Sequence, residues 1–406
     1  MSRHLLKMVW ARRRANGLVA AEILVSFVVL LAVTTLALSY ADNYRQPVGF
    51  SYADVWRVEV NPGRGGGDPR PAVERRPAEV ETMRQVLLTL RATPGVLGVA
   101  VAHPSPFSQN SSNRSYERQG RRVEYGVADA TDELASVLGL RVTRGRFFSR
   151  EDDAATWEPV VINQRLAREL FGHSDPIGRN ISADRDPQGE PERERRVVGV
   201  IEAYRQEGEY DWPINYVLAR HRPDNPAERL RGELLLKVAP GSTAELEERL
   251  LKSVQDVARD WSVRVEPLPV ARNRVTRMYL APLVIVSLLA GFLAIMVTLG
   301  LTGVLWLGVT RRTREIGLRR AKGANAPDIR FLILGEILVL TTLALLPGVI
   351  LALQLPLVGF LPVPGGVFAA SLALSVAGIY LLATLCGFYP AHLAMRVQPA
   401  EALHYE

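Results

Sequence analysis

The sequence has 406 residues, which is enough for two or three domains. Hydrophobic residues make up 48% of it and gather in four long apolar segments, at residues 17–41, 278–310, 331–353 and 367–389. Each segment exceeds the roughly 20 residues that a helix needs to cross a bilayer, so we predict an integral membrane protein. The net charge of +7 does not indicate nucleic-acid binding, because the basic residues lie beside the ends of the apolar segments. With Cys386 as the single cysteine, the sequence excludes an intrachain disulfide and a cysteine-based metal site.

The N-terminal part of the sequence is a basic segment, residues 1–16, followed by the first apolar segment, 17–41. This apolar segment is longer than the core of a signal peptide, and "LALSYADNY" is a weak cleavage site, so we expect a retained membrane span. A second basic segment, 311–325, follows the second span, whereas the loop 355–366 carries no charge. Because positive residues stay in the cytoplasm, we predict cytoplasmic termini and place residues 42–277 outside.

Residues 42–277 are predicted to fold as an α+β domain that contains two strand–helix–strand units. The first unit, 50–103, runs from "DVWRVEV" to "GVLGVAVA" around a helix with one apolar stripe. The second unit, 231–270, runs from "GELLLKV" to "WSVRVEP", and a capping box from Ser242 to Glu245 is expected to begin its helix. Together the two units form one split α/β module. Residues 104–230 are predicted to be an inserted subdomain of short strands and one helix near Asn163–Phe171.

The second apolar segment, 278–310, is unusually long for a membrane span. As a helix it would extend about 50 Å at 1.5 Å per residue, whereas the hydrocarbon core is roughly 30 Å thick. We therefore expect it to project from the bilayer as a stalk. The remaining boundaries predict spans at 326–354 and 367–389, a short outer loop at 355–366 and a cytoplasmic tail at 390–406. The fold class is a four-span helical membrane protein with a large outer α+β domain between its first and second helices.

Motifs for catalysis are missing from the sequence. It contains neither the Gly-Lys-Ser/Thr of a phosphate-binding loop nor a His-Glu-x-x-His pair. Asp152 and Asp153 are adjacent acids, but exposed acids are common and we interpret them as part of a solvated turn. We therefore predict no enzymatic activity and no catalytic, cofactor-binding or metal-binding residues.

The basic segment "TRRTREIGLRRAKGAN" is predicted to hold a short helix that ends at Gly323. Asn325 would then cap the third span, with Pro327 and Asp328 in its first turn. A plain anchor on anionic lipid would explain the arginines. It would not require Glu315 or Gly317, and a mid-helix glycine costs about 1 kcal/mol relative to alanine. The glycine thus predicts that another backbone or side chain approaches this helix closely, and anchoring can coexist with such a contact.

Two acids lie five or six residues inside the cytoplasmic ends of predicted spans, Glu22 in the first and Glu336 in the third. An acid at mid-membrane costs about 2.5–3.5 kcal/mol on insertion scales, which makes it a functional candidate. The shallow position of both residues lowers this cost. We therefore favour a structural role, such as a hydrogen bond between spans, over a proton or substrate site.

Several segments resemble FtsX-like and MacB-type ABC transporter permeases. "RRTREIGLRRAKGA" at 311–324 is similar to their cytoplasmic signature, and "RFLILGEILVL" and "YPAHLAMRVQPAEALHYE" are similar to their third span and ending. "GLRVTRGRFF", "PVVINQRLARELFG", "DPIGRNI" and "VVGVIEAYR" occur in the order of a MacB-type periplasmic core. The resemblance covers nearly the whole chain. It implies that the split module is porter-like and that the insert is sabre-like.

This resemblance implies a permease subunit of a bacterial inner-membrane ABC transporter that works by mechanotransmission in export or efflux. MacB carries a fused ATPase domain, whereas this sequence begins near its first span, so we expect ATP to be bound by a separate ATPase dimer. The implied coupling helix holds Arg311, Arg312, Arg314, Glu315, Gly317, Arg319, Arg320 and Gly323. Further expected partners are the lipid bilayer, a second identical or different permease subunit, a periplasmic adaptor and an outer-membrane channel. The alternative is a regulatory scaffold that activates a cell-wall hydrolase or an envelope sensor.

Overall fold

The structure is a computed structural model in which the chain divides into two compact units. The helical unit comprises Met1–Asp42 and Leu280–Glu406, and the outer unit comprises Asn43–Tyr279. The structure describes residues 13–62, 72–118, 121–182, 194–225, 228, 230–311, 318–319, 321, 325–358 and 363–395.

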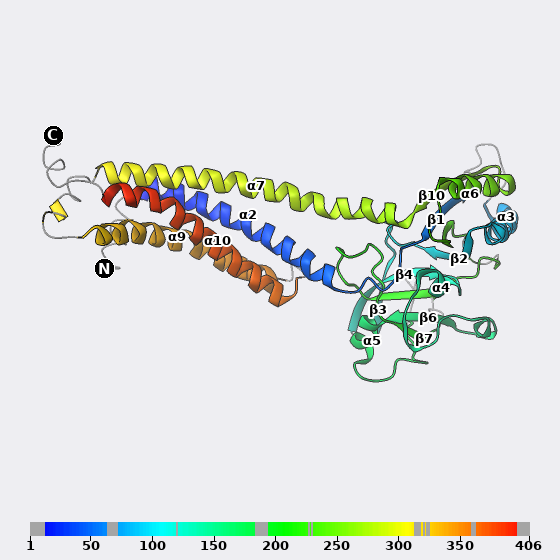
Figure 1. Ribbon diagram of the computed structural model, residues 1–406. Coiled ribbons are helices and arrows are strands. Elements are labelled where there is room, and N and C mark those ends of the chain that lie inside the picture. Colours follow the sequence, from blue (N-terminus) through cyan, green and yellow to red (C-terminus); the bar gives the residue numbers. More distant parts are fainter. Residues whose placement is uncertain are drawn as a thin grey trace. The chain divides into compact units, whose positions relative to one another are not determined.

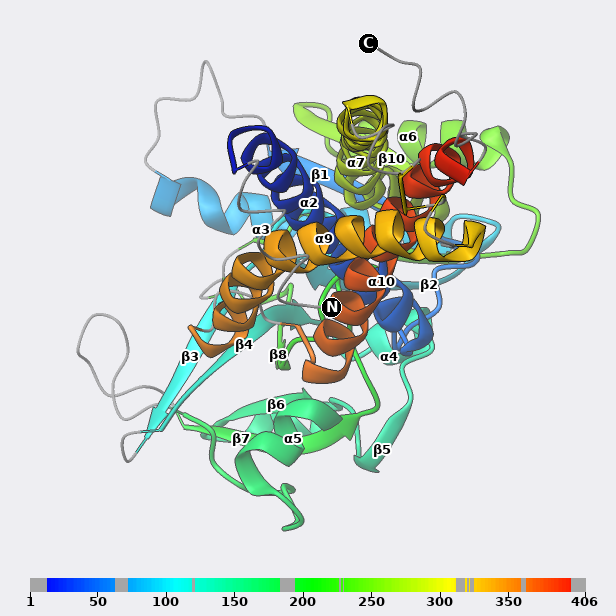
Figure 2. The ribbon, with the colours of Figure 1, turned by 90° about the vertical axis from the view of Figure 1, so that its left-hand side faces the viewer.

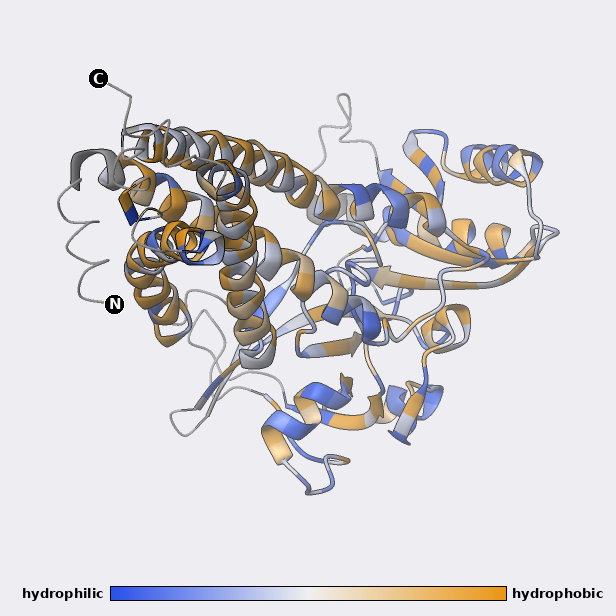
Figure 3. Cartoon of the chain, turned by 60° about the vertical axis from the view of Figure 1, so that its left-hand side comes forward, coloured by the Kyte–Doolittle hydropathy of each residue, from blue (hydrophilic) through white to orange (hydrophobic). Residues whose placement is uncertain are grey.

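Four long helices form the described part of the helical unit: α2 (Arg13–Arg45), α7 (Leu268–Arg311), α9 (Ala326–Leu357) and α10 (Gly365–Met395). Each contains a stretch long and apolar enough to cross a membrane, which agrees with the four predicted spans. Figures 1 and 2 show the four helices packed together, and Figure 3 shows apolar residues along their length. Both α2 and α7 continue from the helical unit into the outer unit.

Small residues let the membrane helices approach closely. A Cβ atom at Gly348 of α9 would lie 2.8 Å from side-chain atoms of Leu24 and Phe27 of α2, and one at Gly387 of α10 would lie 2.2 Å from Ile337 of α9. Lipid tails offer little hydrophobic drive between helices, so such close backbone packing is a main source of their association. Asn325 caps α9 in a capping box with Asp328, which confirms the predicted start of this helix.

The described strands of the outer unit form one ten-stranded sheet in the order β10-β1-β9-β2-β4-β8-β6-β7-β5, with β3 paired to β4. The strands are β1 (Val55–Pro62), β2 (Val96–His103), β3 (Asn113–Arg118), β4 (Arg121–Ala130), β5 (Val142–Gly145), β6 (Glu158–Asn163), β7 (Arg195–Ile201), β8 (Tyr216–Arg220), β9 (Glu233–Val238) and β10 (Trp261–Pro267). The shorter helices are α3 (Ala72–Ala92), α4 (Leu134–Leu138), α5 (Gln164–Phe171), α6 (Ala244–Val257) and the 3₁₀ helix η1 (Arg150–Ala154).

The two strand–helix–strand units interleave in one half of this sheet. Strand β1 pairs with both β10 and β9, and β9 also pairs with β2, all antiparallel. Helices α3 and α6 pack on this half around a core that includes Met83, Leu236 and Leu250. The other strands belong to the insert, which joins the first half where β2 meets β4 at Ala102 and His103.

Three sequence-based predictions about the outer unit and its junction with α7 are wrong. Thr243, not Ser242, is the N-cap of α6, and the Ser242 hydroxyl instead donates to the Ala239 carbonyl. The insert holds α4 and η1 besides α5, because helices of five residues are too short for a periodic pattern. Helix α7 begins at Leu268 rather than at residue 278, since its first turns are buried in the outer unit.

Candidate functional site

The predicted coupling helix falls largely outside the described residues. Arg311 ends α7, and Leu318 and Arg319 are helical. Its other predicted members lie outside the described part of the chain: Arg312, Arg314, Glu315, Gly317, Arg320 and Gly323. The coupling role of this segment therefore stays a prediction.

The two intramembrane acids are both half-buried, Glu22 on α2 and Glu336 on α9. A Cβ atom at Gly300 of α7 would lie 2.5 Å from the Glu22 Oε2 atom, so this carboxylate packs directly on the α7 backbone. A side chain at position 300 would have to displace this carboxylate. Sequence reasoning found Glu22 from its charge alone but had no means to find the residue it contacts.

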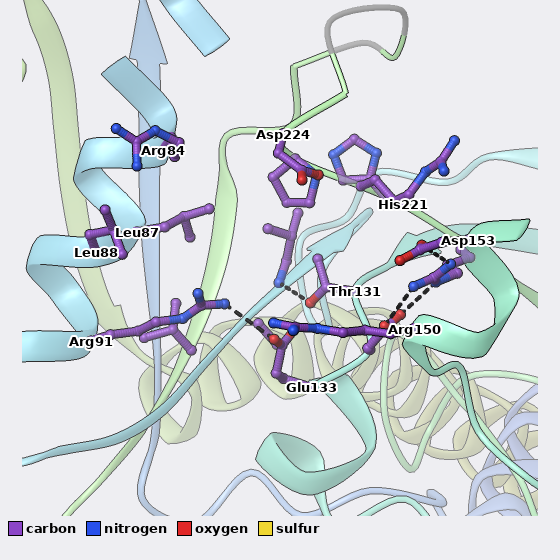
Figure 4. Close-up of a pocket in the computed structure, with 17 residues that line it drawn as sticks. Arg84, Leu87, Leu88, Arg91, Thr131, Glu133, Arg150, Asp153, His221 and Asp224 are labelled. Carbon is purple, nitrogen blue, oxygen red and sulfur yellow. Dashed lines mark hydrogen bonds and ion pairs between the residues drawn. The ribbon is translucent and has the colours of Figure 1, made fainter. Parts of the chain in front are cut away.

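A cleft of about 490 Å³ opens in the outer unit where the two halves of the sheet part (Figure 4). Strand β2 pairs with β9 over most of its length but with β4 only at its last two residues. At the cleft floor, the Val101 amide donates to the Thr131 hydroxyl, and the Thr131 amide donates to the Val101 carbonyl, both at 3.1 Å. Helix α3 forms one wall, and η1 and the chain after β8 form the other.

Five arginines and four acidic residues line this cleft, and several of them form ion pairs with one another. Arg220 donates to both oxygens of Asp132, at 2.7 and 2.8 Å, and to Asp153 at 2.7 Å. These hydrogen bonds hold the pKa of the Arg220 guanidinium above its ordinary value. Arg91 of α3 reaches across to Glu133 at 3.2 Å, as the dashed line in Figure 4 shows. Arg150 is exposed and has no ion-pair partner within the described ranges.

Leu87 and Leu88 of α3 add an apolar edge beside these arginines (Figure 4). Within the residues that the structure describes, no group of His, Cys, Asp and Glu side chains could hold a metal ion. Sequence reasoning missed the cleft because five separate segments of the chain line it.

A second polar centre surrounds η1 in the insert. The Arg146 guanidinium donates to both oxygens of Asp152, at 2.6 and 2.8 Å, and the Ser149 amide donates to Asp152 at 3.0 Å. The Asp152 side chain is 1% exposed, and although burial opposes ionisation, these bonds lower its pKa. The prediction of a solvated turn is therefore wrong for Asp152, because its ion-pair partner precedes it by six residues and escaped the motif search.

Comparison with known families and proteins gives consistent matches. The MacB-like periplasmic core domain matches residues 23–253, and the FtsX-like permease C-terminal family matches residues 272–399. The chain is 24% identical over 353 residues to the macrolide export ATP-binding/permease protein MacB of Neisseria gonorrhoeae, covering 85% of this chain and 52% of that protein. It is 23% identical over 436 residues to the uncharacterized ABC transporter permease YvrN of Bacillus subtilis, covering 98% of this chain and 97% of YvrN.

The chain thus spans about half the length of the MacB relative and nearly all of YvrN. Among solved structures, it is similar to the periplasmic region of MacB from Actinobacillus actinomycetemcomitans, with a TM-score of 0.37 and 12% identity over 55% of this chain and 92% of that one. It is also similar to the extracellular domain of the Gram-positive transporter YknZ, with a TM-score of 0.34 and 13% identity over 52% of this chain and 99% of that domain.

Proposed function

The chain belongs to the MacB-type, FtsX-like family of ABC transporter permeases, and from this premise we propose that it couples a partner ATPase to movement of its own periplasmic domain. The observation that carries the proposal is the order of the two matched domains on a chain with four candidate membrane spans. In this proposal the protein is a multi-pass subunit of the bacterial inner membrane with both termini in the cytoplasm.

ATP hydrolysis is assigned to a separate ATPase dimer, which binds the cytoplasmic side of two permease subunits. In support, the chain aligns with 97% of YvrN, which is named an ABC transporter permease. In this scheme the cytoplasmic segment 311–325 seats in the ATPase, and closure of the ATPase on ATP moves that segment. Export or efflux through an adaptor and an outer-membrane channel then follows from movement of the periplasmic domain.

Mechanotransmission is favoured over alternating access because the two helices that leave the membrane enter the outer unit without a break. Helix α7 has 44 residues, about 65 Å at 1.5 Å per residue, and its first turns are buried in the outer unit. This helix crosses the boundary between the two units with Pro282 inside it, so helical backbone rather than an irregular linker joins them. The four candidate spans of one subunit are also few helices with which to enclose a substrate channel.

Purification of the tagged full chain from its host tests this function. We expect an ATPase subunit to copurify, and we expect Gly317→Leu or Glu315→Gln to weaken that association or to uncouple ATP turnover, without loss of membrane insertion. Gly17→Leu is the matched control, since no atom lies within 4 Å of a Cβ at that exposed glycine. Full complex formation and normal coupling in Gly317→Leu would show that the segment is only a lipid anchor. Copurification of a hydrolase or a sensor in place of an export partner would instead support the regulatory scaffold.

A further inference from the structure

The loop between β7 and β8, residues 202–215, contacts both helices that leave the membrane. We call it the β7–β8 loop. It belongs to the insert, whereas α2 leads into β1 and α7 follows directly from β10, both in the other half of the sheet. All the contacts described below lie within the outer unit, Asn43–Tyr279.

Arg205 holds the end of α2. Its guanidinium donates to the Asn43 carbonyl at 2.6 Å and to the Gln46 carbonyl at 3.2 Å, and its amide donates to the Val48 carbonyl at 3.0 Å. The same guanidinium donates back to two carbonyls of its own loop, Glu209 at 2.7 Å and Asp211. One side chain thus bridges the helix end and the loop.

The Arg205 side chain and its hydrogen bonds are well shielded from water. Arg205 is 3% exposed, and burial lowers the pKa of its guanidinium. Asn43, which is 2% exposed, adds a bond from its side-chain amide to the Tyr210 carbonyl at 3.3 Å. A buried carbonyl that loses its donor is destabilising, so replacing Arg205 disturbs several groups at once.

Glu209 and Asp211 of the same loop hold the start of α7. The Arg272 guanidinium donates to Glu209 at 2.8 Å and lies 5.0 Å above the Tyr52 ring, whose hydroxyl donates to the same carboxylate at 3.3 Å. Asp211 also hydrogen-bonds to Tyr279. Two loop residues, four and six positions beyond Arg205, therefore reach a second helix.

The loop packs both against strand β8 of the insert and against the segment that joins α2 to β1. Tyr204 is fully buried, and its ring lies 4.7 Å from Tyr216 and 5.5 Å from Phe50. Gly49 has φ +92°, and a Cβ there would lie 2.0 Å from the Ala203 carbonyl oxygen, so the two backbones touch. A displacement of either helix end is thus transmitted to the insert through closely packed atoms rather than through a flexible connection.

We propose that the β7–β8 loop is the joint that locks the ends of α2 and α7 to each other and to the insert, with Arg205 and Glu209 as its positioning residues. The role of the joint in transport rests on the proposed function, but the coupling between the two helix ends is a property of this chain alone. A joint of this kind makes the insert follow the helices, so that the cleft between α3 and η1 changes with them.

Hydrogen exchange of the full chain in lipid nanodiscs tests the joint without any partner. We expect Arg205→Gln to raise exchange about tenfold or more in residues 43–50 and also in residues 268–279. Because coupling is reciprocal, Arg272→Gln must raise exchange at the α2 end as well. Arg84→Gln is the matched control, since Arg84 pairs, among the residues that the structure describes, only with Glu81 on its own exposed helix face. If each variant loosens only the helix it touches, the two ends are anchored independently and the joint is refuted.

Arg272→Gln keeps the test valid if the variant at the more buried Arg205 fails to fold. Because Arg272 is partly exposed, its replacement is expected to leave the chain folded. Exchanging the two charges of the Glu209–Arg272 ion pair gives a further test. Glu209→Arg alone is expected to raise hydrogen exchange at both helix ends, and combining it with Arg272→Glu is expected to restore the slow exchange of the wild type. Loss of protection that the exchange does not restore counts against the joint.

In the complex purified with its ATPase, spin labels on α7 and on α5 are expected to change separation with ATP, and Arg272→Gln abolishes that change while ATP turnover persists. An ATP-driven change that survives in Arg272→Gln overturns the role of the joint in transport. Failure of any ATPase to copurify rejects the proposed function but leaves the exchange result standing.

Discussion

Glu207 should make the stability of the outer unit depend on pH near neutrality. This residue of the β7–β8 loop is half-buried, and its Oε1 atom accepts from the Gln109 amide at 3.0 Å and the Gln206 side chain at 3.2 Å. Its Oε2 atom is buried and has no hydrogen-bond partner among the described residues. Burial, reinforced by the negative charge of Asp211, raises the pKa of Glu207 from 4.5 to about 7.

The sign of the effect follows from this raised pKa. The folded state binds the Glu207 proton more tightly than the unfolded state, so its stabilising contribution is complete below pH 4.5. The contribution is lost as the pH rises through about 7. At about 1.4 kcal/mol per pH unit, the loss is at most about 3 kcal/mol, and water at the half-buried carboxylate reduces it to about 2 kcal/mol.

Hydrogen exchange of the full chain measures this loss. The amides of β9 lie in the middle of one half of the sheet, and Leu234, Leu235 and Leu236 are fully buried, so their slowest exchange reports unfolding of the outer unit. After correction for intrinsic exchange, we expect the wild type to lose about 2 kcal/mol more than Glu207→Gln between pH 5 and pH 8. Equal pH dependence of the two proteins, within about 0.5 kcal/mol, would refute the reasoning.

Acids whose pKa is lowered act in the opposite direction and at lower pH. Although burial opposes it, hydrogen bonds that include one from His221 lower the pKa of Glu228 to about 2, so its contribution is present above 4.5 and is lost on acidification toward 2. These groups are the same in the wild type and in Glu207→Gln. Their effects cancel in the comparison, which isolates the Glu207 carboxyl.

Two further predictions concern single contacts. Asp152→Ala should lower the free energy of unfolding of the outer unit by about 1–3 kcal/mol, because it removes two hydrogen bonds from the partly exposed Arg146 guanidinium and one from the Ser149 amide. Glu151→Ala at the exposed neighbouring position should change it by less than about 0.5 kcal/mol, and denaturant unfolding compares the two variants. Gly300→Leu should destabilise the helical unit by about 1–3 kcal/mol, because its side chain displaces the glutamate carboxylate of α2, and Gly303→Leu has open space and should not. Equal thermal stability of the two glycine variants in detergent would contradict the packing of α2 on α7.

Local sequence determined the features that depend on residues close together in the chain. A membrane span needs only about 20 consecutive apolar residues, so all four spans were predictable from composition along the chain. The Asn325 cap of α9 was predictable for the same reason, since its capping box joins two residues only three positions apart in sequence. Alternation and helical periodicity likewise indicated the strands and helices that form the split α/β half of the outer unit.

Tertiary structure decided every feature that joins distant parts of the chain. Arg205 lies 162 residues from Asn43, and Glu209 lies 63 residues from Arg272, so no local pattern connects them. The early start of α7 at Leu268 depends on burial against the outer unit's core rather than on the apolar run that marks the membrane span. Burial and hydrogen bonds of Asp152 and Glu207 also arise only in the folded chain, because the environment that sets an acid's pKa is built from segments far apart in sequence.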